Sequence, residues 1–305
     1  MSRLRANLLL SVIALIWGSA FVAQSHAMAD MGPMLFTGLR FLIGSAVVLP
    51  LAVLEWRRLG REGRPLKARD GWHIAGLGCL MTLGAALQQI GIQFTSVTNA
   101  GFLTAVYVPL VPVLAWVLLG QVAHWSVWPA AIGCLVGAFL LSGAHELSIG
   151  VGDLWVLASA VPWALHVLMV GRWADRMGAP FLVASGQFAV CGLLSLLAAV
   201  VTEPVQQARV GMAAWPILYT GVMSVGIAFT AQVVAQRHAH AADAAIILSS
   251  ETLFAAGFGY WLLGERLSSV GLIGCGLMLA CVLLVQLMPL VGTLRRRQIL
   301  TSPSN

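Results

Sequence analysis

Ten stretches of apolar residues, nearly free of charged side chains, follow one another along this chain of 305 residues. Each is close to the roughly 20 residues that cross the hydrocarbon core of a membrane as a helix. The alternation of apolar and polar residues that a barrel strand needs does not occur in them. We therefore predict an all-α membrane protein with ten transmembrane helices, over residues 7–25, 34–54, 72–93, 98–119, 126–142, 153–171, 180–201, 212–236, 242–263 and 269–289.

Charged residues make up 9% of the chain and apolar residues 59%, whereas soluble domains carry about 25% charged residues. This composition excludes a soluble protein. The formal net charge is +6, but the basic residues gather in alternate loops, which indicates membrane topology and not a nucleic-acid partner.

The loop charges also predict the orientation in the lipid bilayer. With the N-terminus in the cytoplasm, the outer loops hold only Arg209 and Arg266. We therefore expect a multi-pass protein of the cell inner (plasma) membrane with both termini in the cytoplasm. The basic residues on the cytoplasmic side would be Arg3, Arg5, Arg57, Arg58, Arg61, Arg64, Lys67, Arg69, Arg172, Arg176, Arg237, Arg295, Arg296 and Arg297.

The chain contains an internal repeat. At a shift of 144 positions, the segment WVLLGQ at 116–121 aligns with YWLLGE at 260–265, and Gln88 aligns with Gln232. Five spans of one half map in order onto five of the other, and because five is odd the second copy enters the membrane from the opposite face. We predict an inverted repeat of two five-helix units, an arrangement that supports alternating access in transporters. The predicted divisions are residues 6–142, residues 153–289 and a cytoplasmic tail at 290–305.

The five cysteines are scattered through apolar stretches without a CxxC pair. Neither a disulfide framework nor a zinc site is indicated by this spacing. We expect no metal and no cofactor.

Several segments carry a resemblance to a known family. They are the pair Trp17-Gly18, the pair Arg40-Phe41, the segment TSVTNAGFL at 95–103 that leads into Pro109, and LLGERL at 262–267. In these segments, over about residues 6–289, the chain resembles the EamA-type ten-helix members of the drug/metabolite transporter superfamily.

The resemblance implies a secondary transporter that moves small organic metabolites, such as amino acids or related amines, through a central cavity, with export favoured. Two positions depart from the family pattern. Gln121 stands where an acidic residue is common, and Thr252-Leu253 stands where a proline often follows Glu251.

Two charged residues lie inside predicted spans and away from the first residues of those spans, where an insertion cost of about 2.5–3.5 kcal/mol demands a reason. Arg40 lies in the second span and Glu251 in the ninth. The guanidinium could bind a carboxylate, and the carboxyl group could bind an amine or carry a proton. Alternatively, the two could form a structural ion pair, because buried charges often only pair with each other.

Other polar and aromatic residues complete the predicted substrate site. His166 could take part in proton coupling or could be an interhelical hydrogen-bonding residue. Trp17 and Trp163 match in the repeat and could form aromatic walls of a pocket. Asn99 and Asp243 also match, and we interpret both as helix caps. The predicted substrate-binding residues are Trp17, Arg40, Gln88, Tyr107, Trp163, His166, Gln232 and Glu251.

Two other functions compete with this interpretation. A carrier of organophosphates or nucleotide sugars would need several basic residues in the cavity, and the spans offer only Arg40. An intramembrane protease is suggested by the GxGD sequence at 150–153, but a second aspartate within the membrane is missing. We predict that the protein is not an enzyme. Its expected partners are a small-molecule substrate and the lipid bilayer, without nucleic acid; a monomer suffices, and a dimer is the alternative.

Overall fold

The computed structural model describes residues 1, 3–141 and 150–301, and within these ranges every regular element is a helix. Seven predicted spans each correspond to one helix. These are α1 (Arg3–Ala27), α2 (Pro33–Arg61), α3 (Ala68–Ile92), α6 (Val127–Leu141), α7 (Val151–Met177), α8 (Pro180–Thr202) and α13 (Ser269–Thr301).

The other three predicted spans are interrupted helices. The fourth consists of α4 (Val97–Ala105) and α5 (Tyr107–Leu119). The eighth consists of α9 (Ala214–Tyr219), the π-helix η2 (Thr220–Phe229) and α10 (Thr230–Gln236), and the ninth of α11 (Ala241–Leu248), α12 (Glu251–Phe258) and the π-helix η3 (Gly259–Leu263). A short 3₁₀ turn, η1 (Val205–Gln207), lies in the connection before α9.

Eight helical runs in the described ranges are long and apolar enough to cross a membrane, and two more, Val127–Leu141 and Ser269–Val285, are apolar but shorter. The prediction of an all-helical, multi-pass architecture is therefore confirmed. The two crossings by the shorter helices and the inverted orientation stay predictions. Residue 142, where the first predicted unit ends, and residues 302–305 of the predicted tail lie outside the described residues, whereas 290–301 continue α13.

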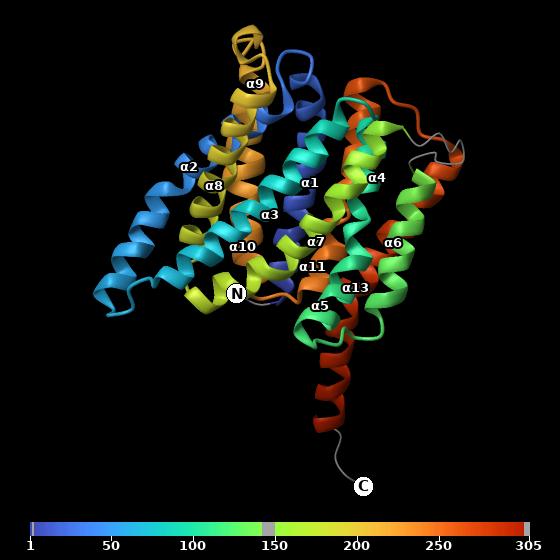
Figure 1. Ribbon diagram of the computed structural model, residues 1–305. Coiled ribbons are helices and arrows are strands. Elements are labelled where there is room, and N and C mark those ends of the chain that lie inside the picture. Colours follow the sequence, from blue (N-terminus) through green and yellow to red (C-terminus); the bar gives the residue numbers. More distant parts are fainter. Residues whose placement is uncertain (2, 142–149, 302–305) are drawn as a thin grey trace.

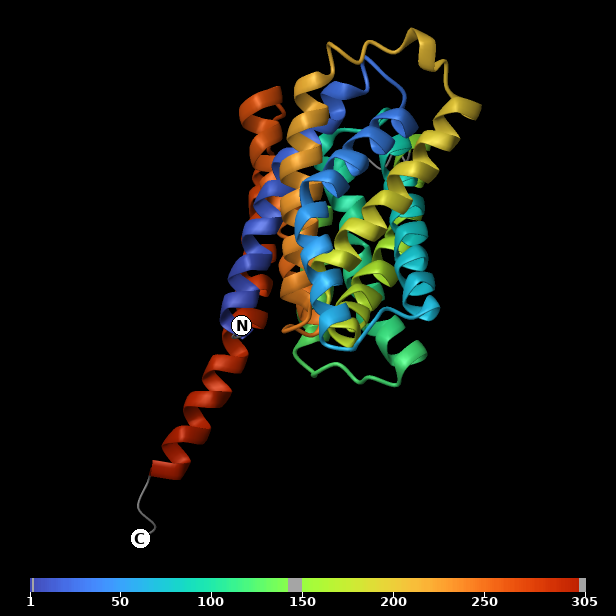
Figure 2. The ribbon, with the colours of Figure 1, turned by 90° about the vertical axis from the view of Figure 1, so that its left-hand side faces the viewer.

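The helices form one bundle, and the start of α1 and the end of α13 lie on the same side of it (Figure 1). We call the end of the bundle where α1 begins the terminal face, and the end where α1 finishes the distal face. Figure 2 shows the last turns of α13 extending beyond the bundle on the side of the terminal face.

The two halves of the chain interleave. The most extensive helix contacts are α2 with α8, α3 with α7, and α6 with α13. Each of these pairs joins a helix from the first predicted unit to one from the second. The hydrophobic core therefore lies between the halves and not inside each of them.

The antiparallel pair α2 and α8 is joined at both ends by a carboxylate that caps the partner helix. At the distal face, Glu203 at the end of α8 accepts hydrogen bonds from the backbone N–H groups of Met34 (2.6 Å) and Leu35 (3.0 Å) at the start of α2. Towards the terminal face, Glu55 of α2 accepts a hydrogen bond from the N–H group of Leu182 (3.0 Å) at the start of α8. The first N–H groups of a helix have no partner inside it, and a negative charge is favourable there.

Midway along this pair the contacts are reciprocal as well. The Ser45 hydroxyl lies 2.9 Å from the Ser185 carbonyl oxygen, and the Ser185 hydroxyl lies 3.1 Å from the Ser45 carbonyl oxygen. Such close approach needs small residues, as a Cβ atom added to Gly192 would lie 2.7 Å from the Leu42 side chain.

The break between α4 and α5 follows from a proline. Pro109 has no N–H group to donate to the carbonyl oxygen of Ala105, and its ring crowds that carbonyl. The helix accordingly ends at Ala105 and starts again at Tyr107. The fourth predicted span is nevertheless one apolar helical run, Val97–Leu119, with a turn at Val106.

The break between α11 and α12 has another cause at the equivalent place. The hydroxyl groups of Ser249 and Ser250 donate to the carbonyl oxygens of Ile246 (2.7 Å) and Ile247 (2.6 Å), three residues earlier. Hydroxyls bonded in this way bend helices. Residue 250 follows residue 106 by the same 144 positions that relate the repeats, so both halves interrupt this helix at the same level.

Candidate substrate site

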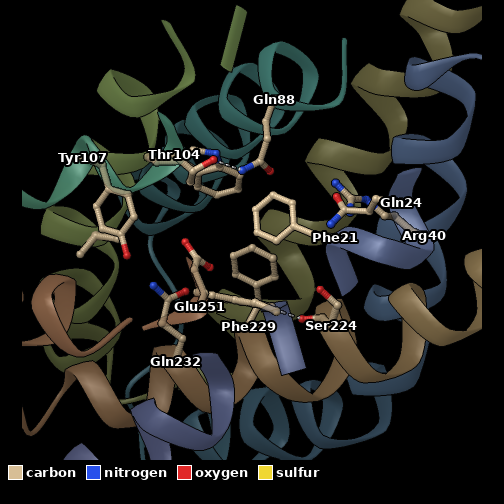
Figure 3. A pocket seen from close by; sticks show the side chains of 13 residues that line it. Phe21, Gln24, Arg40, Gln88, Thr104, Tyr107, Ser224, Phe229, Gln232 and Glu251 are labelled. Carbon is tan, nitrogen blue, oxygen red and sulfur yellow. Dashed lines mark hydrogen bonds between the residues drawn. The ribbon is translucent and has the colours of Figure 1, made fainter. Parts of the chain in front are cut away.

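A pocket lies inside the bundle, between helices of both halves. Figure 3 shows side chains from both halves converging on it. It is lined by Trp17, Phe21, Gln24, Arg40, Gln88, Thr104, Tyr107, Trp163, Val167, Ser224, Phe229, Gln232 and Glu251. Of the eight residues predicted from the sequence, seven line it: Trp17, Arg40, Gln88, Tyr107, Trp163, Gln232 and Glu251.

The interrupted helices place Tyr107 and Glu251 at the pocket. Each is the first residue after a break, and the two are repeat mates. Around them, the Tyr107 hydroxyl donates to the carbonyl oxygen of Ala245 (3.4 Å), and the Thr252 hydroxyl donates to that of Gly101 (3.0 Å). Gly101 and Ala245 are also 144 positions apart, so each broken helix donates to the backbone of the other.

Arg40 is 4% exposed and provides the positive charge of the pocket. Its Nη1 atom donates a 2.5 Å hydrogen bond to Oε1 of Gln24 on α1. The guanidinium carbon lies 5.2 Å from the ring centroids of Phe36 and of Phe41, where cation–π attraction contributes. Its Nε atom is buried without a hydrogen-bond partner among the described residues.

Glu251 is 5% exposed, and its carboxylate points into the pocket (Figure 3). In the described part of the chain, neither an ion pair nor a hydrogen bond joins this carboxylate to another side chain. The alternative that Arg40 and Glu251 form a structural ion pair is therefore not supported by the structure. The two charges stand apart within one pocket.

Aromatic rings fill the space between these charges. The Trp17 and Phe229 ring centroids lie 4.5 Å apart, and Trp163 stacks on Phe229 with centroids 5.8 Å apart. The Trp17 indole donates to the carbonyl oxygen of Ser224 (3.2 Å). Ser224 and Phe229 both belong to η2, and π-helical segments are common at functional sites.

Two glutamine side chains from repeat-related helices also reach the pocket. Gln88 donates from Nε2 to the Thr104 hydroxyl (2.8 Å), which in turn donates to the Ala100 carbonyl oxygen (2.8 Å). The amide oxygen of Gln232 is buried without a partner among the described residues. The pocket thus offers one fixed amide and one with an acceptor oxygen available.

His166 does not line the pocket. It is fully buried, and its Nε2 atom lies 3.0 Å from Oε1 of Gln187 on α8. Its ring meets Trp163 edge-on, with centroids 5.9 Å apart. Of the two interpretations, the geometry matches the interhelical hydrogen-bonding one.

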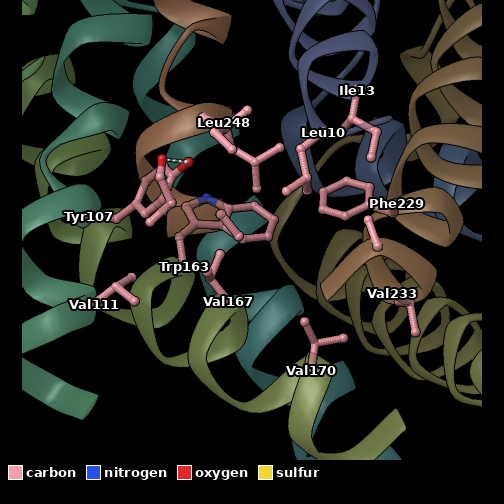
Figure 4. Close-up of a cluster of buried hydrophobic side chains, with 14 of the residues drawn as sticks. Leu10, Ile13, Tyr107, Val111, Trp163, Val167, Val170, Phe229, Val233 and Leu248 are labelled. Carbon is pink, nitrogen blue, oxygen red and sulfur yellow. Dashed lines mark hydrogen bonds between the residues drawn. The ribbon is translucent and has the colours of Figure 1, made fainter. Parts of the chain in front are cut away.

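A cluster of buried hydrophobic side chains adjoins the pocket (Figure 4). On their helices, six of these side chains lie nearer the terminal face than the pocket residues do: Leu10, Ile13, Val111, Val170, Val233 and Leu248. The pocket therefore lies in the distal half of the bundle.

The interpretation of Asn99 as a helix cap was wrong. Ser96 caps α4, since its hydroxyl accepts from the N–H group of Asn99 (3.1 Å). The Asn99 side chain instead donates to Asp153 (2.5 Å), which also accepts from the N–H group of Gly150 (2.9 Å) at the start of α7. Asp153 thereby caps the start of α7, which gives the GxGD sequence a structural explanation. Asp243 lies in the first turn of α11.

Six pocket residues were not predicted: Phe21, Gln24, Thr104, Val167, Ser224 and Phe229. Gln24 had a signal in the sequence, because it is an amide within an apolar span. The aromatic and hydroxyl residues had none, since such residues occur throughout packed membrane helices.

The comparisons of this chain with known proteins agree on one family. The model of the EamA-like transporter family matches residues 4–143 and again residues 150–287. An uncharacterized transporter of Archaeoglobus fulgidus is 31% identical over 285 residues, covering 93% of this chain and 87% of that one. The threonine/homoserine exporter RhtA of Escherichia coli (strain K12) is 26% identical over 281 residues, covering 90% of this chain and 88% of its own.

The fold also has a counterpart among solved structures. A crystal structure with 20% sequence identity superposes with a TM-score of 0.75 and covers 94% of this chain and 98% of the other. At this identity the likeness extends to the fold alone.

Proposed function

Because the chain belongs to the EamA-like transporter family, and is thus a multi-pass membrane transporter of small molecules, we propose that it carries amino acids or related amines, as an exporter, through the central pocket. RhtA, a relative at 26% identity, is named as a threonine/homoserine exporter. The observation that carries the proposal for this chain is the pocket itself, with a guanidinium and a carboxylate held apart by aromatic rings. Solutes with both an acidic and a basic group match these two charges.

The opposite charges favour this proposal over a carrier of organophosphates or nucleotide sugars. Binding of phosphate groups draws on several arginines or lysines. Among the described residues that line the pocket, Arg40 is the single one of either type, and Glu251 would repel a phosphate.

We propose alternating access as the mechanism. The repeat and the reciprocal contacts of α2 and α8 support it, since two equivalent halves can exchange roles to open either face. The α2–α8 pair would move as one body, because carboxylate caps join its helices near both ends. The moving bodies would then each contain helices of both halves, so the sequence halves would not rock as units.

The described arrangement would correspond to a state closed towards the terminal face. We propose that this face is cytoplasmic, as the loop charges predict. Opening it would require the hydrophobic side chains below the pocket to separate. One chain contains both halves of the pocket, so a monomer would suffice.

Transport by purified protein in liposomes tests the proposal. Vesicles preloaded with an unlabelled amino acid should accumulate the same labelled solute by exchange, faster than protein-free vesicles. The panel would contain amino acids, monoamines and sugar phosphates. The proposal is wrong if no amino acid or amine exchanges above the control, or if only sugar phosphates do.

A further inference from the structure

The two charges of the pocket are at different heights along α1. Near one end, Gln24 of α1 accepts the hydrogen bond from Arg40. Near the other, Gly18 of α1 abuts the start of α12, where an added Cβ atom would lie 2.9 Å from the Glu251 carbonyl oxygen and 2.8 Å from the Ala255 nitrogen. Six residues of helix separate Gly18 from Gln24, which is about 9 Å at 1.5 Å per residue.

The Glu251 side chain adds to this separation. Side chains in a helix tilt towards its N-terminus, and α12 runs towards the distal face. The carboxyl group is therefore further from the distal face than the carbonyl oxygen that abuts Gly18. Arg40, held by Gln24, is on the distal side of the pocket, and Glu251 is near its middle.

The direct path between the two charges is occupied. Figure 3 shows the rings of Phe21 and Phe229 between Arg40 and Glu251. Trp17 lies against Phe229, at 4.5 Å between centroids, and closes this layer further. A ligand that touches both charges has to pass beside these rings, and the part of it that does so is in contact with apolar surface.

We propose that the pocket is specific for an amphoteric solute whose acidic and basic groups are separated by an apolar spacer of about three to five carbon atoms. The acidic group binds Arg40 towards the distal face, the spacer lies along the aromatic rings, and the basic group binds Glu251. This inference rests on the proposed transport function and narrows its substrate class.

An α-amino acid with an uncharged side chain fits this arrangement poorly. Its nitrogen and carboxyl carbon are two bonds apart, roughly 2.5 Å. Even with a contact of about 2.8 Å at each end, it reaches both charges only along the straight line that the rings occupy. In 6-aminohexanoate the same two atoms are six bonds apart, about 7 Å when extended.

Two isomers test the charge separation on the unaltered protein. 6-Aminohexanoate and 2-aminohexanoate have the same atoms and net charge and differ in the distance between their charges. In liposome exchange against a labelled transported solute, 6-aminohexanoate should compete at a concentration at least tenfold lower. Shorter members of the series, 4-aminobutanoate and glycine, should show where the minimum length lies.

Analogues with a single charge then show which residue binds the acidic group of the solute and which binds the basic group. Arg40→Gln should weaken competition by 6-aminohexanoate and by hexanoate about tenfold and leave competition by hexylamine unchanged. Glu251→Gln should weaken competition by 6-aminohexanoate and by hexylamine and leave competition by hexanoate unchanged. Cys79→Ser, at an exposed site on α3, is the matched control. Equal or better competition by 2-aminohexanoate overturns the inference and leaves the transporter proposal intact. If no amino acid, amine or member of this series is exchanged at all, the transporter proposal fails with it.

Discussion

Arg40 and Gln187 are related by the internal repeat, 147 positions apart, and each is bonded to a side chain of the helix before its own. Arg40 on α2 donates to Gln24 on α1, and Gln187 on α8 pairs with His166 on α7. The first pair opens on the pocket, whereas the second is fully buried and does not line it.

Other repeat-related positions have stayed alike. The carboxylate caps of α2 and α8 and the two helix breaks occur in both halves. Symmetry is thus retained where the halves pack against each other. It is lost at the charges of the pocket, because Arg40 and Glu251 have the uncharged repeat mates Gln187 and Tyr107.

The largest effect is expected from placing the first half's charge in the second. In Gln187→Arg, a guanidinium would be buried beside His166 without a counter-charge, which costs about 3–5 kcal/mol of folding free energy. Thermal unfolding of the purified protein in detergent measures this. Gln187→Leu, which removes the amide without adding charge, is the control and should cost less, about 1–3 kcal/mol. A Gln187→Arg protein as stable as the unaltered one would show that the Gln187–His166 pair is accessible to water.

A smaller effect is expected from removing the partner of Arg40. Gln24→Leu leaves the guanidinium without its acceptor, and hydrogen bonds to charged groups contribute about 1.5–3 kcal/mol. We expect lower thermal stability by that amount and weaker binding of acidic solutes. Gln93→Ala, at an exposed glutamine, is the control. If Gln24→Leu leaves both quantities unchanged, Gln24 does not hold Arg40 in position.

The carboxylate caps should respond alike in the two halves. Glu55→Ala and Glu203→Ala should each destabilise the protein by about 0.5–2 kcal/mol, as losses of helix caps do. Glu55 is buried and Glu203 is half-buried, so we expect the larger value for Glu55. Because the sites are at opposite ends of the helix pair, their effects should add in the double variant. Thermal unfolding in detergent measures the stability of the two single variants and the double variant. A loss in the double variant well below the sum of the two single losses would show that the caps are not independent.

The smallest effect on transport is expected at His166. Since it does not line the pocket, His166→Gln should change the exchange rate less than twofold and leave its pH dependence as in the unaltered protein. Glu251→Gln should remove any pH dependence, because it replaces the titratable group of the pocket by a neutral amide. Exchange rates between pH 5.5 and 8.5 measure both. If the exchange rate of His166→Gln depends less on pH than that of the unaltered protein, His166 takes part in the transport mechanism.

The sequence predicts the helices of this fold well and their interruptions poorly. Hydropathy marks each span because a lipid environment excludes charge. It carries no information on the π-helical segment η2 or on the break at Ser249 and Ser250, which depend on local hydrogen bonds. Pro109 was visible in the sequence as part of the family resemblance, yet its effect on Ala105 requires knowing which carbonyl the helix would use.

The pocket residues also differ in how well the sequence predicts them. Arg40, Gln88, Gln232 and Glu251 stand out because polar groups are rare and costly in apolar spans. The direction in which a side chain points is harder to predict. Trp163 and His166 are three residues apart on α7, yet one lines the pocket and the other faces α8. Both sides of such a helix are in contact with protein, so periodicity does not distinguish them.

The exchange of caps between α2 and α8 has a consequence for how the chain is made. The start of α2 is synthesised early, but the carboxylate that caps it, Glu203, belongs to a residue translated about 170 positions later. While the ribosome is still producing the second half, the N–H groups of Met34 and Leu35 lack this partner. The α2–α8 pair is therefore capped at both ends only after residues of both halves have been synthesised.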